Sequence, residues 1–336
     1  MSIHRGRCWL PNLAEYMLLQ FATARLGAIL VTLNPAYRAQ ELVHAMAKTE
    51  CKVIALTPAV ASSDYSSILG SIDPSALPSL ENVLVVPTSS QKSDQVLAHS
   101  AVNSIRSRGY SAMLSDDVLL AARQRDPPKD VIAAALCSSL APSEPIMYQF
   151  TSGTTGLPKA VSLSHCNIVH NAVHIASMQR LTNEDRVCIP VPMYHCFGIV
   201  LGSLSCTSAG AAVVFPASNF QPEATLRAVE KHRCTSLYGV PTMFIAELAL
   251  PAFKSYDLSS LRTGIMAGSN CPQETMKRVQ RDMHMSEVTI AYGMTETSPV
   301  SWQSSHDTPL AKRVSTVGRI HPHVECKVWP RSYDFG

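Results

Sequence analysis

The sequence predicts an α/β fold made of large, mostly parallel β-sheets that are covered by helices. Short runs rich in β-branched residues recur along the chain, and stretches with helical spacing lie between most of them. The strand-like runs are continuously apolar, as in sheets that are buried on both faces. Ligands of such sheets bind beyond the carboxyl ends of the strands, so we expect a functional site there.

The predicted elements alternate along most of the chain. β-branched runs indicate the strands, and apolar residues three and four positions apart indicate the helices. We expect strands at residues 53–56, 83–86, 187–191, 211–215, 236–240 and 288–292, and helices at residues 13–26, 41–48, 167–179 and 222–232.

Two segments depart from this alternation. Residues 87–128 are rich in Ser, Gln, Asp and Arg and close on "RQRDPPKD", which is typical of surface segments. We therefore expect a surface insertion or linker with one or two helices outside the core. Residues 329–336 have neither a strand nor a helix signal and are expected to form an irregular tail.

The overall composition is that of a soluble globular protein. The 336 residues are 46% hydrophobic and 16% charged, with a net charge of +3, so neither disorder nor a nucleic-acid partner is indicated. None of the ten cysteines forms a CxxC pair. Free thiols in a reducing compartment are therefore favoured over disulfides or a metal site.

Neither a secretory signal nor a membrane span is predicted. The first residues, "MSIHRGRCWLPN", lack the apolar region and cleavage site of a secretory signal, although a mitochondrial presequence stays open. Residues 196–215 have no charge, but three glycines and four Ser or Thr residues dilute their apolar content. A core helix followed by a buried strand is favoured there over a transmembrane helix.

The loop in "FTSGTTGLPKA", residues 150–160, has the features of a phosphate-binding site. Residues 145–150 and the following "AVSLS" are strand-like, and Ser164 can cap a helix that begins at His165. Glycines let backbone N–H groups turn inward, four hydroxyls add donors and Lys159 adds a charge. The spacing G-x-x-G-x-x-K differs from the Walker pattern. A flexible Ser/Thr loop is the alternative interpretation.

Two further stretches have side chains that suit a nucleotide. "VTIAYGMTETSPVS", residues 288–301, offers the aromatic face of Tyr292, the hydroxyl of Thr295 and the carboxylate of Glu296. These groups can stack on a base, bind a phosphate and hold Mg²⁺. "GIMAGSNCPQE", residues 264–274, ends a strand in Ala-Gly-Ser, which is small enough to lie against a flat ring.

These motifs resemble those of a known superfamily. "TSGTTGLPKA", "YGVPTMF", "AGSNCPQE" and "AYGMTETSP" occur in this order, as in the adenylate-forming (AMP-binding) superfamily of acyl-CoA synthetases, luciferases and peptide-synthetase adenylation domains. The stretches "LPNLAEYMLLQFATARLGAILVTLNPAYRAQEL" and "TVGRIHPHVE" are similar to the medium-chain acyl-CoA synthetases called acyl-CoA synthetase family member 2. The similarity extends from about Leu10 to Val328.

The resemblance implies a role for individual residues. His195 would lie beside the acyl carboxylate, Thr295 would meet the α-phosphate, and Glu296 with Thr151 would bind Mg²⁺. Adenine would be held by Gly268, Ser269 and Tyr292, with Gly293 also at the ATP site. The loop around the β- and γ-phosphates would comprise Thr151, Ser152, Gly153, Thr154, Thr155, Gly156, Leu157, Pro158 and Lys159. The catalytic residues would be Lys159, His195, Thr295 and Glu296.

The implied reaction is ATP-dependent activation of a medium-chain fatty acid. The carboxylate attacks the α-phosphorus, pyrophosphate leaves, and the thiol of coenzyme A displaces AMP. Because the substrates bring both nucleophiles, the protein supplies positioning and charge neutralisation, in agreement with the absence of a GxSxG motif. The resemblance implies an intracellular enzyme, in the mitochondrion or alternatively the cytoplasm. Acyl-chain length and oligomeric state stay open.

The sequence departs from the superfamily pattern in two respects. Ala160 stands where glycine usually follows the lysine, and the chain lacks both the part that precedes "LPN" and the small carboxy-terminal domain with its lysine. We therefore expect a partial adenylation domain over residues 1–336. It would have an incomplete first subdomain at 1–145 and a nucleotide-binding core at 146–328. A catalytically inactive nucleotide-binding or interaction fragment is the alternative function.

A histidine-rich stretch is not explained by these roles. "HCNIVHNAVH" places His170 and His174 four residues apart on one helix face, where they form a conceivable zinc pair. No third ligand is evident, so a solvated or core-edge helix face is favoured. "HPH", residues 321–323, is predicted to be a turn.

Overall fold

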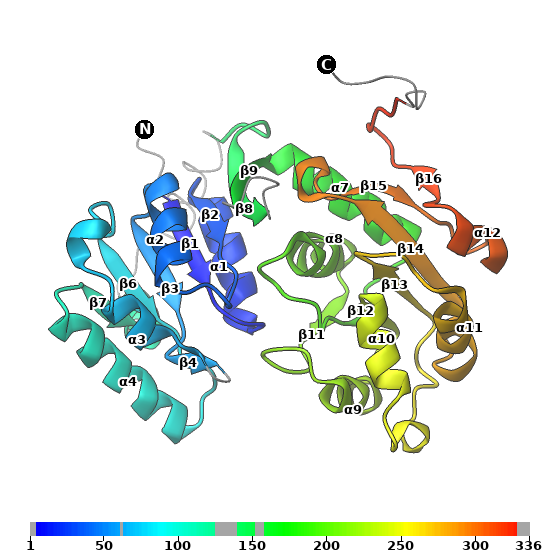
Figure 1. The fold of residues 1–336 in the computed structure, drawn as a ribbon, viewed down its shortest axis with the longest axis horizontal. Coiled ribbons are helices and arrows are strands. Elements are labelled where there is room, and N and C mark those ends of the chain that lie inside the picture. Colours follow the sequence, from blue (N-terminus) through cyan, green and yellow to red (C-terminus); the bar gives the residue numbers. More distant parts are fainter. Residues whose placement is uncertain (1–4, 61–62, 125–139, 152–157, 328–336) are drawn as a thin grey trace.

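The computed structural model describes residues 5–60, 63–124, 140–151 and 158–327. In these ranges the strands form two seven-stranded sheets and one two-stranded hairpin. The first sheet and its helices lie on the left in Figure 1, and the second sheet lies on the right. The predicted class, mostly parallel sheets covered by helices, is confirmed.

The first sheet has the strand order β7-β6-β3-β1-β2-β8-β9, and its neighbours are parallel except for the antiparallel pair β8 and β9. Its strands are β1 (Arg5–Trp9), β2 (Ile29–Thr32), β3 (Val53–Leu56), β6 (Asn82–Val85), β7 (Ala112–Leu114), β8 (Pro145–Thr151) and β9 (Lys159–Ser164). The hairpin consists of β4 (Ala59–Val60) and β5 (Ser63–Asp64). The helices are α1 (Ala14–Arg25), α2 (Ala39–Lys48), α3 (Tyr65–Gly70), η1 (Pro74–Ala76), α4 (Lys92–Ser107) and α5 (Ser115–Gln124).

The second sheet has the order β11-β10-β12-β13-β14-β15-β16, and only β15 and β16 are antiparallel to their neighbours. Its strands are β10 (Arg186–Cys188), β11 (Ala212–Val214), β12 (Ser236–Gly239), β13 (Thr263–Ala267), β14 (Glu287–Gly293), β15 (Val300–Gln303) and β16 (Arg319–Ile320). The α-helices are α7 (His165–Met178), α8 (Ser205–Ala209), α9 (Pro222–His232), α10 (Pro241–Leu248), α11 (Gln273–Asp282) and α12 (Leu310–Ser315). Shorter helical segments are the π-helical η2 (Phe197–Leu204), η3 (Phe253–Ser255) and η4 (Thr295–Thr297).

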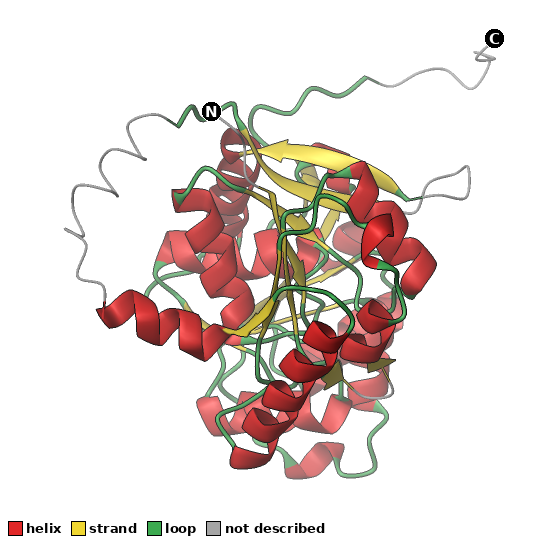
Figure 2. Ribbon diagram, turned by 90° about the vertical axis from the view of Figure 1, so that its left-hand side faces the viewer, coloured by secondary structure: helices red, strands yellow, loops and turns green. Residues whose placement is uncertain are grey.

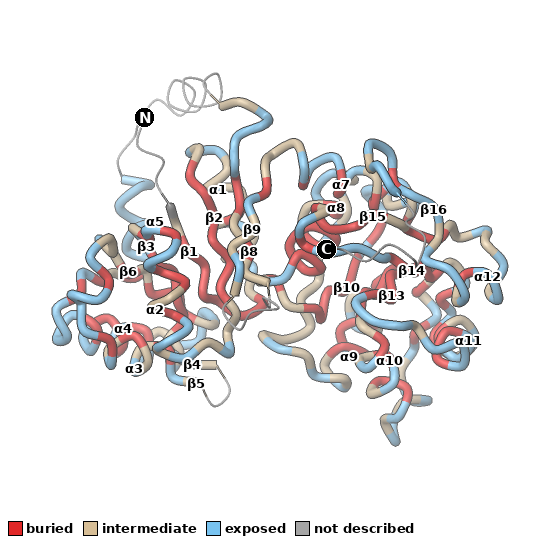
Figure 3. The backbone as a smooth tube through the Cα atoms, turned by 45° about the horizontal axis from the view of Figure 1, so that its top comes forward, coloured by how far each residue is buried: buried red, intermediate tan, exposed pale blue. Residues whose placement is uncertain are grey.

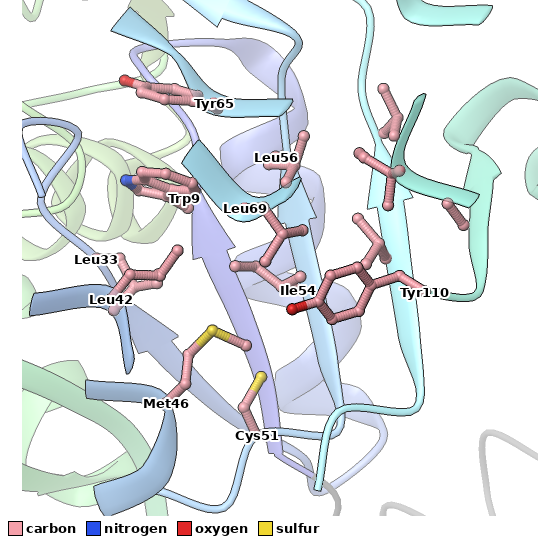
Figure 4. Packing of buried hydrophobic residues seen from close by; sticks show 14 of the residues in the cluster. Trp9, Leu33, Leu42, Met46, Cys51, Ile54, Leu56, Tyr65, Leu69 and Tyr110 are labelled. Carbon is pink, nitrogen blue, oxygen red and sulfur yellow. The ribbon is translucent and has the colours of Figure 1, made fainter. Parts of the chain in front are cut away.

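Helices flank the strands on both sides (Figure 2), and the inner faces of sheets and helices are buried (Figure 3). A large core beside the first sheet includes Trp9, whose ring stacks on Tyr65 with centroids 4.3 Å apart (Figure 4). The Trp9 indole N–H donates to the carbonyl of Asn34. This core therefore fixes the end of the loop that follows β2.

Each predicted strand and helix has a counterpart in the structure, and α9 has the bounds that its spacing predicts. The expectation for residues 87–128 needs correction. Ile105 of α4 is fully buried and β7 pairs with β6, so this segment contributes to the core and to the sheet.

β11 is a half-exposed edge strand rather than the buried strand that the sequence predicts. Strands β8 and β9 belong to the first sheet, although they lie beyond residue 145; the division into subdomains remains a prediction. The predicted tail, residues 329–336, lies outside the described residues.

Two polar side chains of the first half join it to the second. The Asn12 amide donates to the Val191 carbonyl over 2.9 Å and accepts from the Met193 N–H over 2.8 Å. Gln20 of α1 donates to the Ile199 carbonyl and accepts from the Ser203 hydroxyl. All these groups are buried, so the contact between the two halves is well defined. In the described part of the chain, no helix is long and apolar enough to cross a bilayer.

Ion pairs that include the buried Asp185 fix the amino-terminal ends of strands in the second sheet. One Arg262 guanidinium nitrogen lies 2.9 Å from both carboxylate oxygens of Asp185, and another lies 3.0 Å from Glu287. Burial opposes ionisation of Asp185, but hydrogen bonds from Thr235 and Arg262 outweigh it and lower the pKa of this carboxyl. The folded state binds the Asp185 proton more weakly than the unfolded chain does, so ionised Asp185 stabilises the fold at pH values above the ordinary pKa of an aspartate carboxyl. This stabilisation is lost as the pH falls through the lowered pKa of Asp185.

We expect Arg262→Met to lower the free energy of unfolding by about 2–3 kcal/mol at pH 7, because it leaves the Asp185 carboxylate buried without its cation. Urea unfolding monitored by circular dichroism measures this loss. Lys277→Met is the matched control, since it removes an exposed helix pair with Glu274 that contributes under about 0.5 kcal/mol. Equal effects of both variants would contradict the prediction.

Candidate active site

A cavity of about 540 Å³ lies where carboxyl-terminal strand ends of the two sheets meet. The first sheet contributes Asn34 and the end of β8, and the second contributes the ends of β13 and β14. We call it the central cavity; it is lined by Asn34, Phe150, Thr151, Tyr194, His195, Cys196, Phe197, Leu201, Ala267, Gly268, Ala291, Tyr292, Gly293, Met294, Thr295, Glu296, Pro299 and Val300. Its position is the one expected for a ligand site of parallel sheets.

A second cavity of about 540 Å³ adjoins the first. Both are lined by Gly268, Ala291, Tyr292 and Gly293. The outer cavity, as we call it, is completed by Ser269, Asn270, Cys271, Ile290, Val314, Ser315, Thr316 and Val317. A single ligand can therefore place one part in each cavity and contact the shared residues in between.

Two glycines shape the shared wall. Gly268 follows β13 with φ +89°, a left-handed conformation that favours glycine. A Cβ at Gly293 would collide with the carbonyl oxygen of Pro299, so the chain after β14 can fold back closely only without a side chain. Beside them, the Tyr292 side chain is 54% exposed and its ring meets Trp302 edge-on at 5.6 Å. Its open surface can stack on a planar base.

The phosphate-loop prediction is tested only at its two ends. β8 ends at Thr151, which pairs with Lys159 at the start of β9, so the residues between them join two antiparallel strands as predicted. Ser164 caps α7 by accepting a hydrogen bond from the N–H of Asn167. Thr151 lines the central cavity and Lys159 is exposed. Ser152, Gly153, Thr154, Thr155, Gly156 and Leu157 lie outside the described residues, and Pro158 is half-buried beside them.

His195 and Thr295 both approach the sulfur of Cys196. The Cys196 sulfur is 3.5 Å from His195 Nδ1 and 3.8 Å from the Thr295 hydroxyl oxygen. The Phe197 backbone N–H donates to Nδ1 over 3.1 Å, so the neutral imidazole holds its proton on Nε2. Although the ring faces the cavity, the surrounding protein atoms desolvate it and lower its pKa. His195 is therefore a neutral hydrogen-bond donor near pH 7.

Glu296 supplies a carboxylate to the same cavity. The side chain is exposed on η4 and forms no ion pair with another described residue. Its oxygens are thus available to a hard cation, and the Thr151 hydroxyl lines the same cavity. Oxygen ligands of this kind suit Mg²⁺, so the residues present fit the metal that the motifs imply.

The structure therefore brings Thr151, His195, Gly268, Tyr292, Gly293, Thr295 and Glu296 around the central cavity, with Ser269 in the outer one. Other lining residues were not predicted, among them Asn34, Tyr194 and residues 314–317. Asn34 and Tyr194 follow β2 and β10 closely, and the rule that ligands bind beyond strand ends points to both. Residues 314–317 are the last two residues of the short helix α12 and the two that follow it, and no local signal identifies them.

The sequence and fold together define the class. Residues 7–331 match the family described as AMP-binding enzyme, and the chain belongs to this family. This confirms the resemblance inferred from the motifs. Acyl-CoA synthetases and ligases are among its relatives.

Three relatives show the similarity in more detail. The chain is 43% identical to the putative acyl-CoA synthetase YngI of Bacillus subtilis over 98% of its own length and 58% of the relative's. It is 39% identical to the acyl-CoA ligase SID4 of Ajellomyces capsulatus over 94% of its own length and 51% of the relative's. It is 38% identical to the mitochondrial medium-chain acyl-CoA ligase ACSF2 of Danio rerio over 95% of its own length and 52% of the relative's. The chain thus spans about half the length of the curated relatives it matches.

Solved structures support the fold. The anthranilate CoA ligase AuaEII in complex with anthranoyl-AMP superposes with a TM-score of 0.72 at 20% identity, covering 95% of this chain and 55% of that one. The amino-terminal domain of FACL13 from Mycobacterium tuberculosis gives 0.70 at 20% identity, covering 95% and 69%. The chain therefore has the fold of the amino-terminal region of adenylate-forming ligases.

Proposed function

We propose that this chain binds ATP and a carboxylic acid in the two adjoining cavities and forms the acyl-adenylate of an acid–thiol ligase. The acid carboxylate attacks the α-phosphorus, an oxygen–phosphorus bond forms, and pyrophosphate leaves with the electrons of the broken bond. The coenzyme A thiol then displaces AMP to give the thioester. The observation that supports this most directly is that Thr151, His195, Thr295 and Glu296, from both sheets, line one cavity.

The base and the phosphates of ATP have matching groups. Adenine would lie between the Gly268 backbone and the Tyr292 ring, because both line the two cavities and the glycine brings no side chain to the wall. The Thr295 hydroxyl would donate to an α-phosphate oxygen, and the β- and γ-phosphates would extend toward Lys159 and the loop before it. A bound Mg²⁺ would neutralise phosphate charge, with Glu296 and Thr151 as its ligands.

The acid would bind on the apolar side of the central cavity. Tyr194, Phe197, Leu201 and Val300 supply apolar surface there, which suits an aliphatic acid. The neutral His195 would donate from Nε2 to the acid carboxylate and hold it against the α-phosphate without neutralising its nucleophilic charge. A medium-length acyl chain and a location in the mitochondrion are inferred only from relatives such as ACSF2, and both are part of this proposal.

Carboxylate-dependent exchange of label between pyrophosphate and ATP tests the adenylation step on this chain. We expect exchange with Mg-ATP and a medium-chain acid, and a loss of about tenfold or more in Lys159→Ala, because one phosphate-neutralising charge is removed. Lys231→Ala, on an exposed part of α9, is the matched control and should leave the rate unchanged.

Absence of carboxylate-dependent exchange in the parent chain would contradict adenylation by this chain, and equal measurable rates in the parent and in Lys159→Ala would exclude the role assigned to Lys159. Calorimetry with Mg-ATP then decides what remains. Heat of binding without exchange would leave the catalytically inactive nucleotide-binding fragment as the function, and no heat would also exclude nucleotide binding.

A further inference from the structure

Four histidines from distant parts of the sequence lie together outside both cavities. Two come from α7, His170 and His174, and two follow β16, His321 and His323. The His323 ring centroid is 5.9 Å from that of His170 and 6.1 Å from that of His174, and the His174 ring is 6.1 Å from His321. The sequence shows no further ligand near His170 and His174, but the fold places two more histidines beside them. We call this group the histidine cluster.

The fold holds the two sides of the cluster in place independently of any ligand. The Asn171 side chain donates to the Val300 carbonyl over 2.7 Å and accepts from its N–H over 3.1 Å, which fixes α7 against β15. The His321 backbone N–H donates to Ser301 of the same strand over 2.8 Å. Figure 1 shows α7 beside β15. The backbone on both sides of the cluster is thus anchored to β15.

His321 has the features of an oriented metal ligand. It is only 4% exposed, and its Nε2 lies 3.1 Å from Oε1 of the buried Gln303. Since an amide oxygen only accepts, Nε2 holds the proton and Nδ1 presents its lone pair. This Nδ1 is buried and has no hydrogen-bond partner. Metal-binding histidines are commonly oriented in this way, by donating the other ring N–H to an oxygen.

We propose that the histidine cluster binds a divalent transition-metal ion of the zinc class through imidazole nitrogens of His170, His174 and His323, with His321 as the fourth ligand. Imidazole suits Zn²⁺, Ni²⁺ and Cu²⁺. At metal–nitrogen distances near 2.0 Å, two rings on one ion have centroids roughly 5–6 Å apart, close to the separations in the cluster.

Binding requires the imidazole rings to move toward one another. In the described residues no group of three or more His, Cys, Asp or Glu side chains is already placed to hold a metal ion, so the cluster has to contract. His170 and His323 are exposed, and their side chains can turn without disturbing the core.

The consequence of metal binding would be a link between α7 and the chain after β16. α7 begins directly after β9, the second strand of the phosphate-loop hairpin, while β16 lies at the edge of the second sheet. A metal would thus hold the edge of one sheet to a helix attached to the other. This role is separate from the Mg²⁺ at Glu296 and does not depend on the proposed adenylation.

The test is a calorimetric titration of the chain with ZnCl₂ at pH 7.5, compared with the double variant His170→Ala/His174→Ala. We expect one equivalent bound by the parent chain, a rise in its melting temperature on binding, and affinity weaker by more than about 100-fold in the double variant. His99→Ala/His232→Ala, on α4 and α9, is the matched control and should bind as the parent does. His323→Ala, at an exposed position, should also lose the equivalent.

Replacing the nearby thiol of Cys166 tests whether a cysteine, rather than the histidines, binds the metal. The Cys166 sulfur lies 3.6 Å from Nδ1 of His170, so Cys166→Ser belongs in the same series and should keep the bound equivalent. Melting temperatures without metal verify that each variant is folded. The proposal is overturned if the folded histidine double variant binds Zn²⁺ as tightly as the parent, if Cys166→Ser abolishes binding, or if the parent binds none.

Discussion

Glu296→Gln is expected to lower the carboxylate-dependent exchange rate by about 100- to 1,000-fold, a size typical for removing a group that stabilises charge in a transition state. The substitution keeps the shape of the side chain but removes the negative charge that attracts Mg²⁺ to the central cavity. A neutral amide binds a hard cation weakly, so the phosphate charge stays unneutralised. The loss should be partly restored by raising the Mg²⁺ concentration, because binding rather than folding is impaired.

The control for this substitution is Glu184→Gln, which changes an equally exposed carboxylate before β10 and outside both cavities. It should leave exchange unchanged, and both variants should melt at the temperature of the parent chain. If Glu296→Gln reduced exchange by less than about threefold, Glu296 would have no role in adenylation.

Gly293→Ala is expected to reduce stability and nucleotide binding together. The added methyl group would overlap the Pro299 carbonyl oxygen, and a backbone atom cannot turn away as the end of a flexible side chain can. Overpacking of this kind costs about 1–3 kcal/mol of unfolding free energy. The strain falls on the segment with Thr295 and Glu296, since the Met294 N–H is bonded to Pro299. Urea unfolding and ATP calorimetry measure the two effects.

Gly70→Ala is a suitable comparison, because a Cβ at this helix end meets only the Arg108 side chain at an ordinary 3.5 Å. It should change unfolding free energy by less than about 0.5 kcal/mol and leave ATP binding intact. Similar losses in the two variants would show that Gly293 has no special packing requirement.

Local signals explain why so much of the fold can be predicted. α9 starts with a proline at its first turn and has one apolar face, and Ser164 has the hydroxyl that a helix start needs. β1 was missed because Arg5 and Arg7 interrupt its apolar pattern, yet Arg7 is buried in the structure. The core residues Ala98, Val102 and Ile105 of α4 have helical spacing, but the polar residues around them concealed it.

The candidate site could be predicted where one stretch of sequence holds several of its groups, as in Tyr292 to Glu296. It could not be predicted where two remote segments have to meet. Cys196 approaches Thr295 only because the loop after β10 and the turn after β14 end at the same edge of the sheet. His170 and His323 are separated in the same way, so their proximity follows from tertiary structure alone.

The hydrogen bonds of Asn12 and Gln20 also constrain the order of events during synthesis. Their partners lie 177 to 183 residues further along the chain, and at typical ribosome speeds this delay lasts roughly 10–40 s. During that interval Leu10 and Tyr16, which pack in the core with Ile199 and Val200, remain without these partners on the nascent polypeptide. Chaperones that bind apolar segments would therefore meet this region first, before the second sheet has been made.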